Sequence, residues 1–406
     1  MDAYSIWPFF ACMGLLFAFA ASPALSMADA PPGQGSNRLA ALDGLRAFAA
    51  LAVVFHHGIY YRTFLTDREW GGPDVPGFYT LLGHAGVAIF FMVTGYLFWS
   101  RLLRESGKPA WLPLYLGRIF RIVPLYLLAV SVMLGIVLFE TGGGLNVPLA
   151  VLVKQVARWF AFDFLGSPDV NGYPNTSLLL AGVVWTLRYE WIFYLLLPLA
   201  ALAARDRRMH LPAISLALGV CLAWLVLNPT HWRKIEVVCP TLFLVGMACA
   251  SLHRLDLRPR LPDRLASCAV LLLLAMTFAG FSSAYDVGPI ILLGFAFYLI
   301  ASGCTVFGLL TSRPARRLGD ISYSIYLLQG LVLAAVLRPV PMRAIALDSP
   351  LGYWSLLLLC ALLLIAVSTV TYALVERPGI ALGRRVVASL PKPADGEGRA
   401  APAARS

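Results

Sequence analysis

Residues 42–58 read LDGLRAFAALAVVFHHG, an apolar stretch that contains one arginine and two adjacent histidines. Continued to residue 61, the stretch is long enough to cross a hydrocarbon core of about 30 Å as an α-helix. A charged group at the centre of such a helix costs about 2.5–3.5 kcal/mol on insertion scales, so its presence is informative. The stretch therefore predicts a membrane-spanning helix that carries functional side chains.

The composition of the chain extends this interpretation along its length. Of its 406 residues, 59% are hydrophobic and 13% are charged, whereas soluble domains have about 25% charged residues. The apolar segments do not alternate with a period of two, so helices are favoured over a membrane β-barrel. We expect an all-α fold, a polytopic membrane helix bundle of about ten transmembrane helices. The predicted spans are residues 42–61, 79–100, 122–140, 183–203, 211–228, 235–252, 265–282, 287–310, 320–337 and 354–375.

Positive charge is concentrated in five segments outside the predicted spans, which contain 21 of the 32 Lys and Arg residues. If the chain has ten spans and both termini are cytoplasmic, all five segments lie on the cytoplasmic side. This is the side where loops carry an excess of basic residues. We therefore expect a multi-pass protein of the bacterial inner (cytoplasmic) membrane, in contact with membrane lipids. The net charge of +11 follows from this pattern and does not indicate nucleic-acid binding. Residues 148–165 contain charges and predict an interfacial or partly inserted helix instead of an eleventh span. The five basic segments are residues 101–121, 204–210, 252–264, 311–317 and the tail from 376.

The ends of the chain differ from its middle in composition. Residues 1–38 are expected to be an N-terminal extension and linker, and residues 39–385 the membrane domain. The apolar run 8–22 resembles a signal peptide, but no Lys or Arg precedes it. We expect either that Met27 is the true start or that the preceding segment is dispensable. Residues 386–406, rich in Pro, Ala, Gly and charge, predict a disordered cytoplasmic tail.

Arg46 and His57 are eleven residues apart, which is almost three turns of an α-helix. Their side chains therefore share one face, separated by roughly 16 Å along the axis, while His56 points about 100° away. A guanidinium can bind phosphates, and an imidazole deeper in the membrane can act as a general base on a hydroxyl. The alternative is structural: Arg46 pairs with Asp43, and His57 bonds to another helix.

This spacing resembles the acyltransferase 3 family of bacterial integral membrane O-acyltransferases, whose first helix carries an Arg followed by ten residues and a His. The resemblance runs in order from residue 42 to residue 378 and covers the membrane domain only, with no fused soluble domain. Further segments that look like those of the family are GVAIFFMVTGYLFWSRLL from Gly86, RIFRIVPLY from Arg118, WTLRYEWIFYLLLP from Trp185, LGDISYSIYLLQG from Leu318 and VERP from Val375.

Three positions depart from the family pattern. Thr94 replaces the usual Ser, and Ala88 stands where an acidic residue is common. Gln329 stands near a position where many members have a His. We interpret Gln329 as a secondary feature, although an inactive relative that serves as a scaffold is a further alternative.

The resemblance implies that His57 is the catalytic base and that Arg46 belongs to the same site. Arg118 and Arg121, one turn apart, could bind the phosphates of an acyl-CoA donor; the alternative is that they anchor the cytoplasmic end of a span. As an intramembrane carboxylate, Glu190 is expected to pair with an arginine or to orient His57.

Other residues of these segments have simpler interpretations. For the carboxylate of Glu190, the structural alternative is an ion pair with Arg188. Trp185, at the outer boundary, is by default an aromatic-belt residue and is also a candidate for substrate binding. Tyr323 and Tyr326 are expected to pack in the interior, and Glu376 is expected to mark the end of the last span.

The resemblance implies a membrane acyltransferase that moves an acyl group, acetyl or similar, from cytoplasmic acyl-CoA to a hydroxyl. The implied acceptor is a cell-envelope or secreted glycan, or a lipid-linked saccharide. The alternative is a small-molecule transporter or permease with an intramembrane Arg/His path. No metal or cofactor is expected beyond acyl-CoA as donor substrate, and the sequence contains no H-E-x-x-H, P-loop or G-x-G-x-x-G motif.

Overall fold

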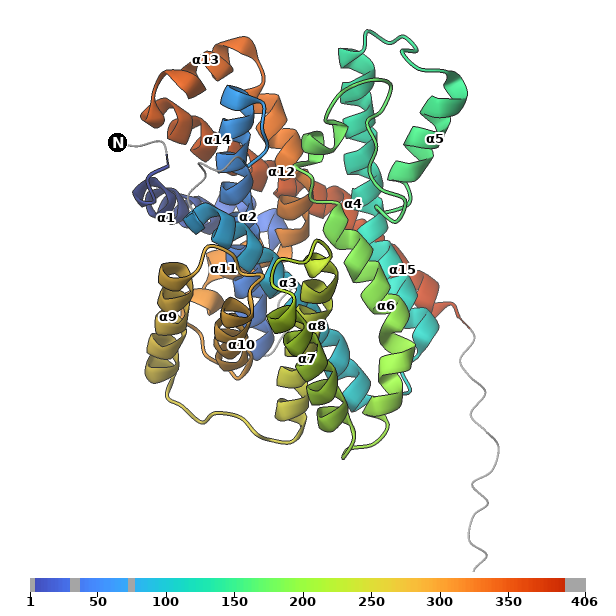
Figure 1. Cartoon of the computed structure of the whole chain (residues 1–406), viewed down its shortest axis with the longest axis vertical. Helices are drawn as coiled ribbons and strands as arrows, with labels where there is room; N and C mark the ends of the chain where they lie inside the picture. Colours follow the sequence, from blue (N-terminus) through green and yellow to red (C-terminus); the bar gives the residue numbers. More distant parts are fainter. Residues whose placement is uncertain (1–3, 30–36, 72–76, 391–406) are drawn as a thin grey trace, which may run out of the picture.

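The computed structural model describes residues 4–29, 37–71 and 77–390, and in these ranges every regular element is helical. The predicted all-α bundle is confirmed (Figure 1). The helices are α1 (Trp7–Ala21), α2 (Asn37–Asp67), α3 (Gly77–Arg104), α4 (Trp111–Glu140), α5 (Leu149–Trp159), α6 (Trp185–Ala204), α7 (His210–Leu227), α8 (Lys234–Arg254), α9 (Asp263–Gly280), α10 (Val287–Ala301), α11 (Arg313–Asp320), α12 (Ser322–Leu337), α13 (Val340–Asp348), α14 (Pro350–Thr371) and α15 (Arg377–Ala388).

Each of the ten predicted spans coincides with a helix. In the described part of the chain, eight helices are long and apolar enough to cross a membrane. A ninth span results when α11 and α12, which meet at a bend of 69°, are counted together. The remaining candidate, α10, has 15 residues and is about 22 Å long, shorter than a typical hydrocarbon core. The eleven-residue helix α5 is too short to span, which agrees with the exclusion of residues 148–165 from the spans.

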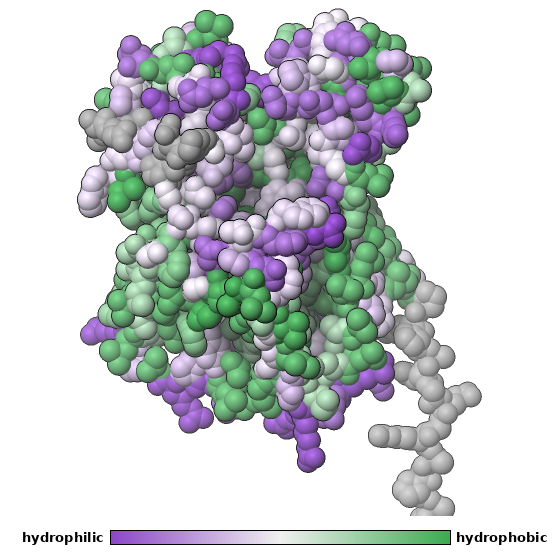
Figure 2. Space-filling model, viewed as in Figure 1, coloured by the Kyte–Doolittle hydropathy of each residue, from purple (hydrophilic) through white to green (hydrophobic). Residues whose placement is uncertain are grey.

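Three of the predicted basic segments lie at one end of the bundle. Figure 1 shows the turns α3–α4, α6–α7 and α8–α9 at the lower end, and Figure 2 shows hydrophilic side chains along that edge below a broad apolar band. The predicted loop 101–121 is shorter than expected, because α4 begins at Trp111. Which end faces the cytoplasm stays a prediction, as does the cytoplasmic position of the termini.

Helix α2 lies in the interior, packed against α3, α11 and α12. Glycines permit the closest approaches between the central helices. A Cβ atom on Gly86 of α3 would lie 2.7 Å from the Ala49 carbonyl oxygen of α2. Between α3 and α8, a Cβ on Gly246 would lie 2.0 Å from the Met92 carbonyl oxygen. Small residues at these contacts let helix backbones pack directly against one another, which is how helices associate in a lipid environment.

A break in the last long helix turns the chain toward α4. Between α14 and α15, residues Tyr372–Glu376 form a π-helical turn, a feature common at functional sites. After it, a Cβ on Gly379 would lie 2.9 Å from the Phe120 carbonyl oxygen. Pro124, four residues after Phe120, has no N–H, so the Phe120 carbonyl oxygen lacks its usual hydrogen bond within α4. The turn thereby places Glu376 beside Arg121.

The N-terminal helix α1 packs on the bundle. Leu16 and Ala20 are fully buried, and α1 contacts α11 and α14. The buried Arg317 of α11 donates hydrogen bonds to the carbonyl oxygens of Ala20 and Ser22 and to both carboxylate oxygens of Asp29. The division at residue 38, Met27 as the start and the nature of the tail stay predictions, and residues 391–406 lie outside the described residues.

The Asp29–Arg317 pair predicts a measurable loss of stability in Asp29→Asn. The variant should unfold with about 1–3 kcal/mol less free energy, because the buried guanidinium loses its counter-charge. The loss stays below that of a fully buried pair since Asp29 is 33% exposed. Thermal unfolding in detergent measures it. Arg313→Gln is the matched control: Arg313 also binds Asp29 but is 58% exposed, so its loss should be about 0–1 kcal/mol.

The same pair predicts a dependence on pH. The hydrogen bond from Arg317 lowers the pKa of the Asp29 carboxyl from 3.8 to about 2. A carboxyl whose folded pKa is depressed stabilises the fold above its unfolded pKa and loses that contribution as pH falls through the folded value. The difference in unfolding temperature between the native chain and Asp29→Asn should therefore be constant above about pH 5 and shrink toward pH 2. A difference that grows on acidification would contradict the assignment.

Candidate functional site

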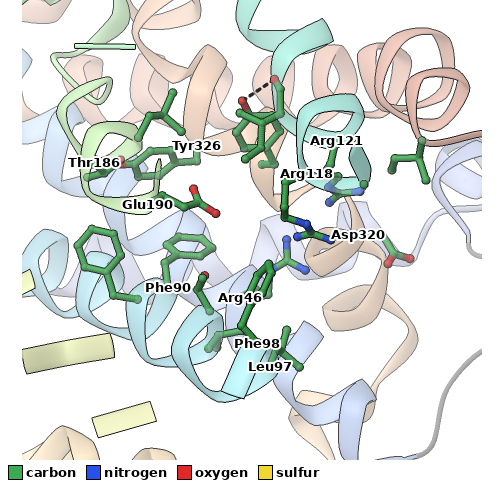
Figure 3. A pocket seen from close by; sticks show the side chains of 18 of the residues that line it. Arg46, Phe90, Leu97, Phe98, Arg118, Arg121, Thr186, Glu190, Asp320 and Tyr326 are labelled. Carbon is green, nitrogen blue, oxygen red and sulfur yellow. Dashed lines mark hydrogen bonds between the residues drawn. The ribbon is translucent and has the colours of Figure 1, made fainter. Parts of the chain in front are cut away.

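A cavity of about 420 Å³ lies between α2, α3, α4, α6, α12 and α15. Four arginines line it: Arg46 from α2, Arg118 and Arg121 from α4, and Arg384 from α15. We call Arg46, Arg118 and Arg121 the interior arginines. Figure 3 shows them with Asp320 on one side of the cavity, and Glu190 on the other side beside Tyr326. The structure thus brings together four of the six residues selected from the sequence, Arg46, Arg118, Arg121 and Glu190.

Acidic side chains accompany the arginines of this cavity. Glu190 and Asp320 are among its lining residues, and Asp43 and Glu376 pair with Arg46 and Arg121. Cations inside an otherwise apolar bundle are costly and are rarely kept without a partner or a function. A cavity lined by several planar guanidinium donors is suited to phosphate groups.

Each interior arginine is held differently. Arg46 pairs with Asp43 at 3.4 Å between Nη1 and Oδ1, as the structural alternative predicted, and also faces the cavity. Arg121 Nη2 lies 3.7 Å from Oε2 of Glu376, a fully buried carboxylate. The guanidinium of Arg118 lies over the ring of Phe98 at 5.1 Å and has no ion pair with an acid in the described part of the chain.

A second cavity, of about 470 Å³, continues the first along α3 and α4. The two share Leu97, Phe98, Gly117 and Arg118 among their lining residues. The second adds Arg101 and Arg104, and Arg101 is bound to Glu105 at 3.0 Å. Together the cavities form a basic passage from the α3–α4 turn into the bundle.

Away from the arginines, the first cavity is lined by apolar side chains such as Phe90 and by a few polar ones. Tyr326 and Thr186 both line it, and their hydroxyls hydrogen-bond at 3.0 Å. Glu190 accepts a hydrogen bond from the hydroxyl of Tyr194, one turn along α6. No ion pair of Glu190 with an arginine, and no contact with His57, is present among the described residues. The charges of Arg118, Arg46 and Arg121 nevertheless act on Glu190. The expected pairing of Glu190 with an arginine and the expected orientation of His57 by Glu190 therefore stay predictions.

His57 lies beyond the cavity, past Tyr326 on α12. Its Nδ1 lies 3.1 Å from Oε1 of Gln329, and the Gln329 amide nitrogen donates to the Tyr326 carbonyl oxygen at 2.7 Å. Gln329 is fully buried, whereas His57 is half-buried. Arg46 and His57 thus share the continuous helix α2 but not the cavity. One turn of α12, from Tyr326 to Gln329, connects the cavity to the histidine.

Aromatic rings surround the other side of His57. The ring of His56 lies 4.8 Å away and that of Trp70 lies 5.9 Å away. His56 hydrogen-bonds through Nδ1 to the Tyr79 carbonyl oxygen and is buried. His84, to which no function was assigned, lies 6.1 Å from His56 and stacks on Tyr285 at 4.0 Å.

Two sequence interpretations need correction at this site. Tyr326 and Tyr323 do not only pack, because both line the cavity. Glu376 does not simply end a span, because it is buried, accepts a hydrogen bond from Ser324 and faces Arg121. Trp185 begins α6 and packs edge-to-face against Tyr189, outside the lining of the cavity. The signal for Glu376 was an acid directly after a long apolar stretch, a position where an unpaired charge is costly.

Comparison with known proteins identifies the relatives of this chain. Residues 39–373 match the model of a family described as acyltransferase domain. The exopolysaccharide production protein ExoZ of Rhizobium meliloti (strain 1021) is 30% identical, over 77% of this chain and 95% of that protein. Nodulation protein 10 of Rhizobium leguminosarum bv. viciae is 28% identical, over 85% of this chain and 94% of that protein.

A third relative is larger than this chain. The Bacillus subtilis (strain 168) protein named "Putative peptidoglycan O-acetyltransferase YrhL" is 28% identical, over 70% of this chain and 47% of that protein. No solved structure matches the fold.

The buried Glu376–Arg121 pair predicts that Glu376→Gln is destabilising. Glutamine has the same shape and keeps an oxygen for Ser324, so the variant removes only the charge. Loss of the counter-charge of Arg121 should lower the free energy of unfolding by about 1–3 kcal/mol, measured by thermal unfolding in detergent. Glu105→Gln is the matched control, because its pair with Arg101 is more than one-third exposed and should contribute about 0–1 kcal/mol. Equal losses in the two variants would show that Glu376 does not balance a buried cation.

Proposed function

The chain belongs to the acyltransferase domain family, and from this membership we propose that it transfers an acyl group from cytoplasmic acyl-CoA to a hydroxyl of a cell-envelope or secreted glycan. The observation that carries the proposal is the arginine-lined cavity, whose lining residue Tyr326 lies one turn of α12 from Gln329, the hydrogen-bond partner of His57. Membership of an acyltransferase family favours this activity over the transporter alternative.

The donor is proposed from the charge and shape of the passage. Acyl-CoA carries phosphates at one end and its thioester at the other, so a site for it needs cations at the entrance and a reactive group farther in. Arg118 and Arg121 would bind the phosphates as planar donors, with Arg384 exposed at the cavity mouth. Arg46 and His57 are about 16 Å apart along α2, so a donor held near Arg46 could extend toward His57.

The acceptor is proposed from the names of the relatives. ExoZ is named for exopolysaccharide production, and the B. subtilis relative is named as an O-acetyltransferase of peptidoglycan. A glycan hydroxyl, free or lipid-linked, fits the reaction that His57 can support. With the donor entering from the basic end, the acceptor would reach His57 from the opposite end, where the aromatic rings lie. The protein would then act in the bacterial inner membrane.

The proposed chemistry uses Nε2 of His57, the imidazole nitrogen that makes no hydrogen bond to a described residue. As a general base, Nε2 of His57 takes the proton of the acceptor hydroxyl while its oxygen attacks the thioester carbonyl. The C–S bond then breaks, and the proton passes from His57 to the departing thiolate of CoA. In the covalent alternative, Nε2 attacks the thioester, carries the acyl group and delivers it to the hydroxyl. Both routes use the same nitrogen and yield an O-acyl glycan and CoA.

His57→Ala tests the proposed reaction. The variant should lose acyl transfer by at least about 100-fold, because it removes the group that activates the hydroxyl or carries the acyl group. Mass spectrometry of envelope and secreted glycans from a deletion strain complemented with each variant measures the acyl groups, and immunoblotting of membranes checks insertion. His231→Ala, at an exposed loop position, should restore acylation fully. Full restoration by His57→Ala would refute the role of His57.

Arg118→Ala and Arg121→Ala test the donor site separately. Each should weaken the binding of CoA by about 10- to 100-fold, because a charge-assisted hydrogen bond to phosphate contributes about 1.5–3 kcal/mol. Calorimetric titration of the purified protein with CoA at low and high salt measures the affinity. Arg260→Ala removes an exposed cation from the α8–α9 turn and should leave the affinity unchanged. Equal effects of all three substitutions would indicate nonspecific attraction instead of a site.

A further inference from the structure

We propose that Gln329 is a positioning residue that fixes the tautomer of His57, keeping the proton on Nδ1 and leaving Nε2 open to react. The inference deepens the proposed function and rests on it, because an open Nε2 matters for activity only if His57 takes part in acyl transfer. It rests on geometry for the tautomer itself: Oε1 of Gln329 faces Nδ1 of His57 at 3.1 Å.

The orientation of the Gln329 amide is set by its own helix. The Tyr326 carbonyl oxygen can only accept a hydrogen bond, and it lies 2.7 Å from Nε2 of Gln329. The amide group must therefore present its NH₂ to Tyr326, because the opposite orientation would set two oxygens against each other. Gln329 is fully buried, so no solvent is present to relieve that repulsion. This leaves the amide oxygen facing His57.

The amide oxygen in turn determines where the imidazole carries its proton. An oxygen acceptor requires a donor, so Nδ1 of neutral His57 must be protonated and Nε2 must carry the lone pair. No described residue hydrogen-bonds to Nε2, and this nitrogen is not among the buried polar atoms that lack a partner, so it is open to an incoming group. When Nε2 takes the proton of the acceptor hydroxyl, the Nδ1–H bond to Oε1 remains in place, and the amide dipole stabilises the imidazolium.

The two neighbouring histidines are held in other ways. His56 also faces an acceptor through Nδ1, but that acceptor is the backbone carbonyl of Tyr79, and the side chain is buried. His84 faces the hydroxyl of Ser283, which can donate or accept, so this contact fixes no tautomer. Among these three, His57 alone combines a tautomer set by a side chain with an accessible second nitrogen.

Two substitutions separate the acceptor from the volume of the side chain. Gln329→Met has nearly the same length and no acceptor for Nδ1–H. Gln329→Glu keeps an oxygen toward His57 and, when protonated, an O–H that can donate to the Tyr326 carbonyl oxygen. Acetyl transfer from radiolabelled acetyl-CoA to the glycans of membranes that contain each variant gives kcat and KM for the donor.

The expected result is a split between kcat and KM. Gln329→Met should lower kcat by about 10- to 100-fold, the range typical for loss of a residue that orients a histidine, with the KM for acetyl-CoA within about twofold. Gln329→Glu should keep kcat within a few-fold of the native value. A native kcat in Gln329→Met, a rise in KM alone, or an equal loss of kcat in both variants would overturn the proposal.

The tautomer is measured independently of transfer. In protein labelled with ¹⁵N-histidine and reconstituted in nanodiscs, the His57 signals are assigned by their loss in His57→Asn. The native chain should show a protonated Nδ1 and an unprotonated Nε2, and Gln329→Met a mixture of both tautomers. A proton on Nε2 in the native chain would overturn the inference. If the tautomer is as expected but no chain transfers acetyl groups, the proposed function fails and the positioning geometry stands.

Discussion

Four guanidinium groups meet in a cavity of an otherwise apolar helix bundle, and the arrangement of the helices around them reflects the cost of holding that charge. Arg121 is compensated by Glu376, which reaches it because a π-helical turn redirects the last long helix toward α4. Arg46 is compensated by Asp43 on its own helix. Arg118 lies over the ring of Phe98, hydrogen-bonds with Tyr194 and has no ion pair with an acid in the described part of the chain, so its guanidinium can pair with an anionic ligand.

The arginine-lined cavity and the histidine are separate features that two helices join. Helix α2 carries Arg46 into the cavity and His57 beyond it, while α12 supplies Tyr326 to the cavity and Gln329 to the histidine. A donor bound by its phosphates would be guided along these two helices toward a single nitrogen. The glycines of α3 and α8 let α3, which forms one wall of this passage, pack closely against α2 and α8.

The sequence predicted what depends on local pattern. Apolar stretches located the helices, and eleven-residue spacing placed Arg46 and His57 on α2. The start of α4 was missed because Arg118 and Arg121 lower the local hydropathy, although the helix continues and turns both side chains into the cavity. The bond between His57 and Gln329 joins residues 272 positions apart, which no local pattern can reveal. For the same reason, the sequence assigned Glu190 a role beside His57 that Gln329 occupies in the structure.

The central claim is that one bound donor reaches from the arginine-lined cavity to His57. It is tested most directly by an electron cryo-microscopy map of the protein in nanodiscs with a non-hydrolysable acetyl-CoA analogue. The account predicts phosphate density against Arg118 and Arg121, with the acyl end past Tyr326 and within about 3.5 Å of Nε2 of His57, as near-attack geometry requires. Density that places the acyl end in the cavity with Tyr326 closing the way to His57, or a donor bound elsewhere on the protein, would contradict it.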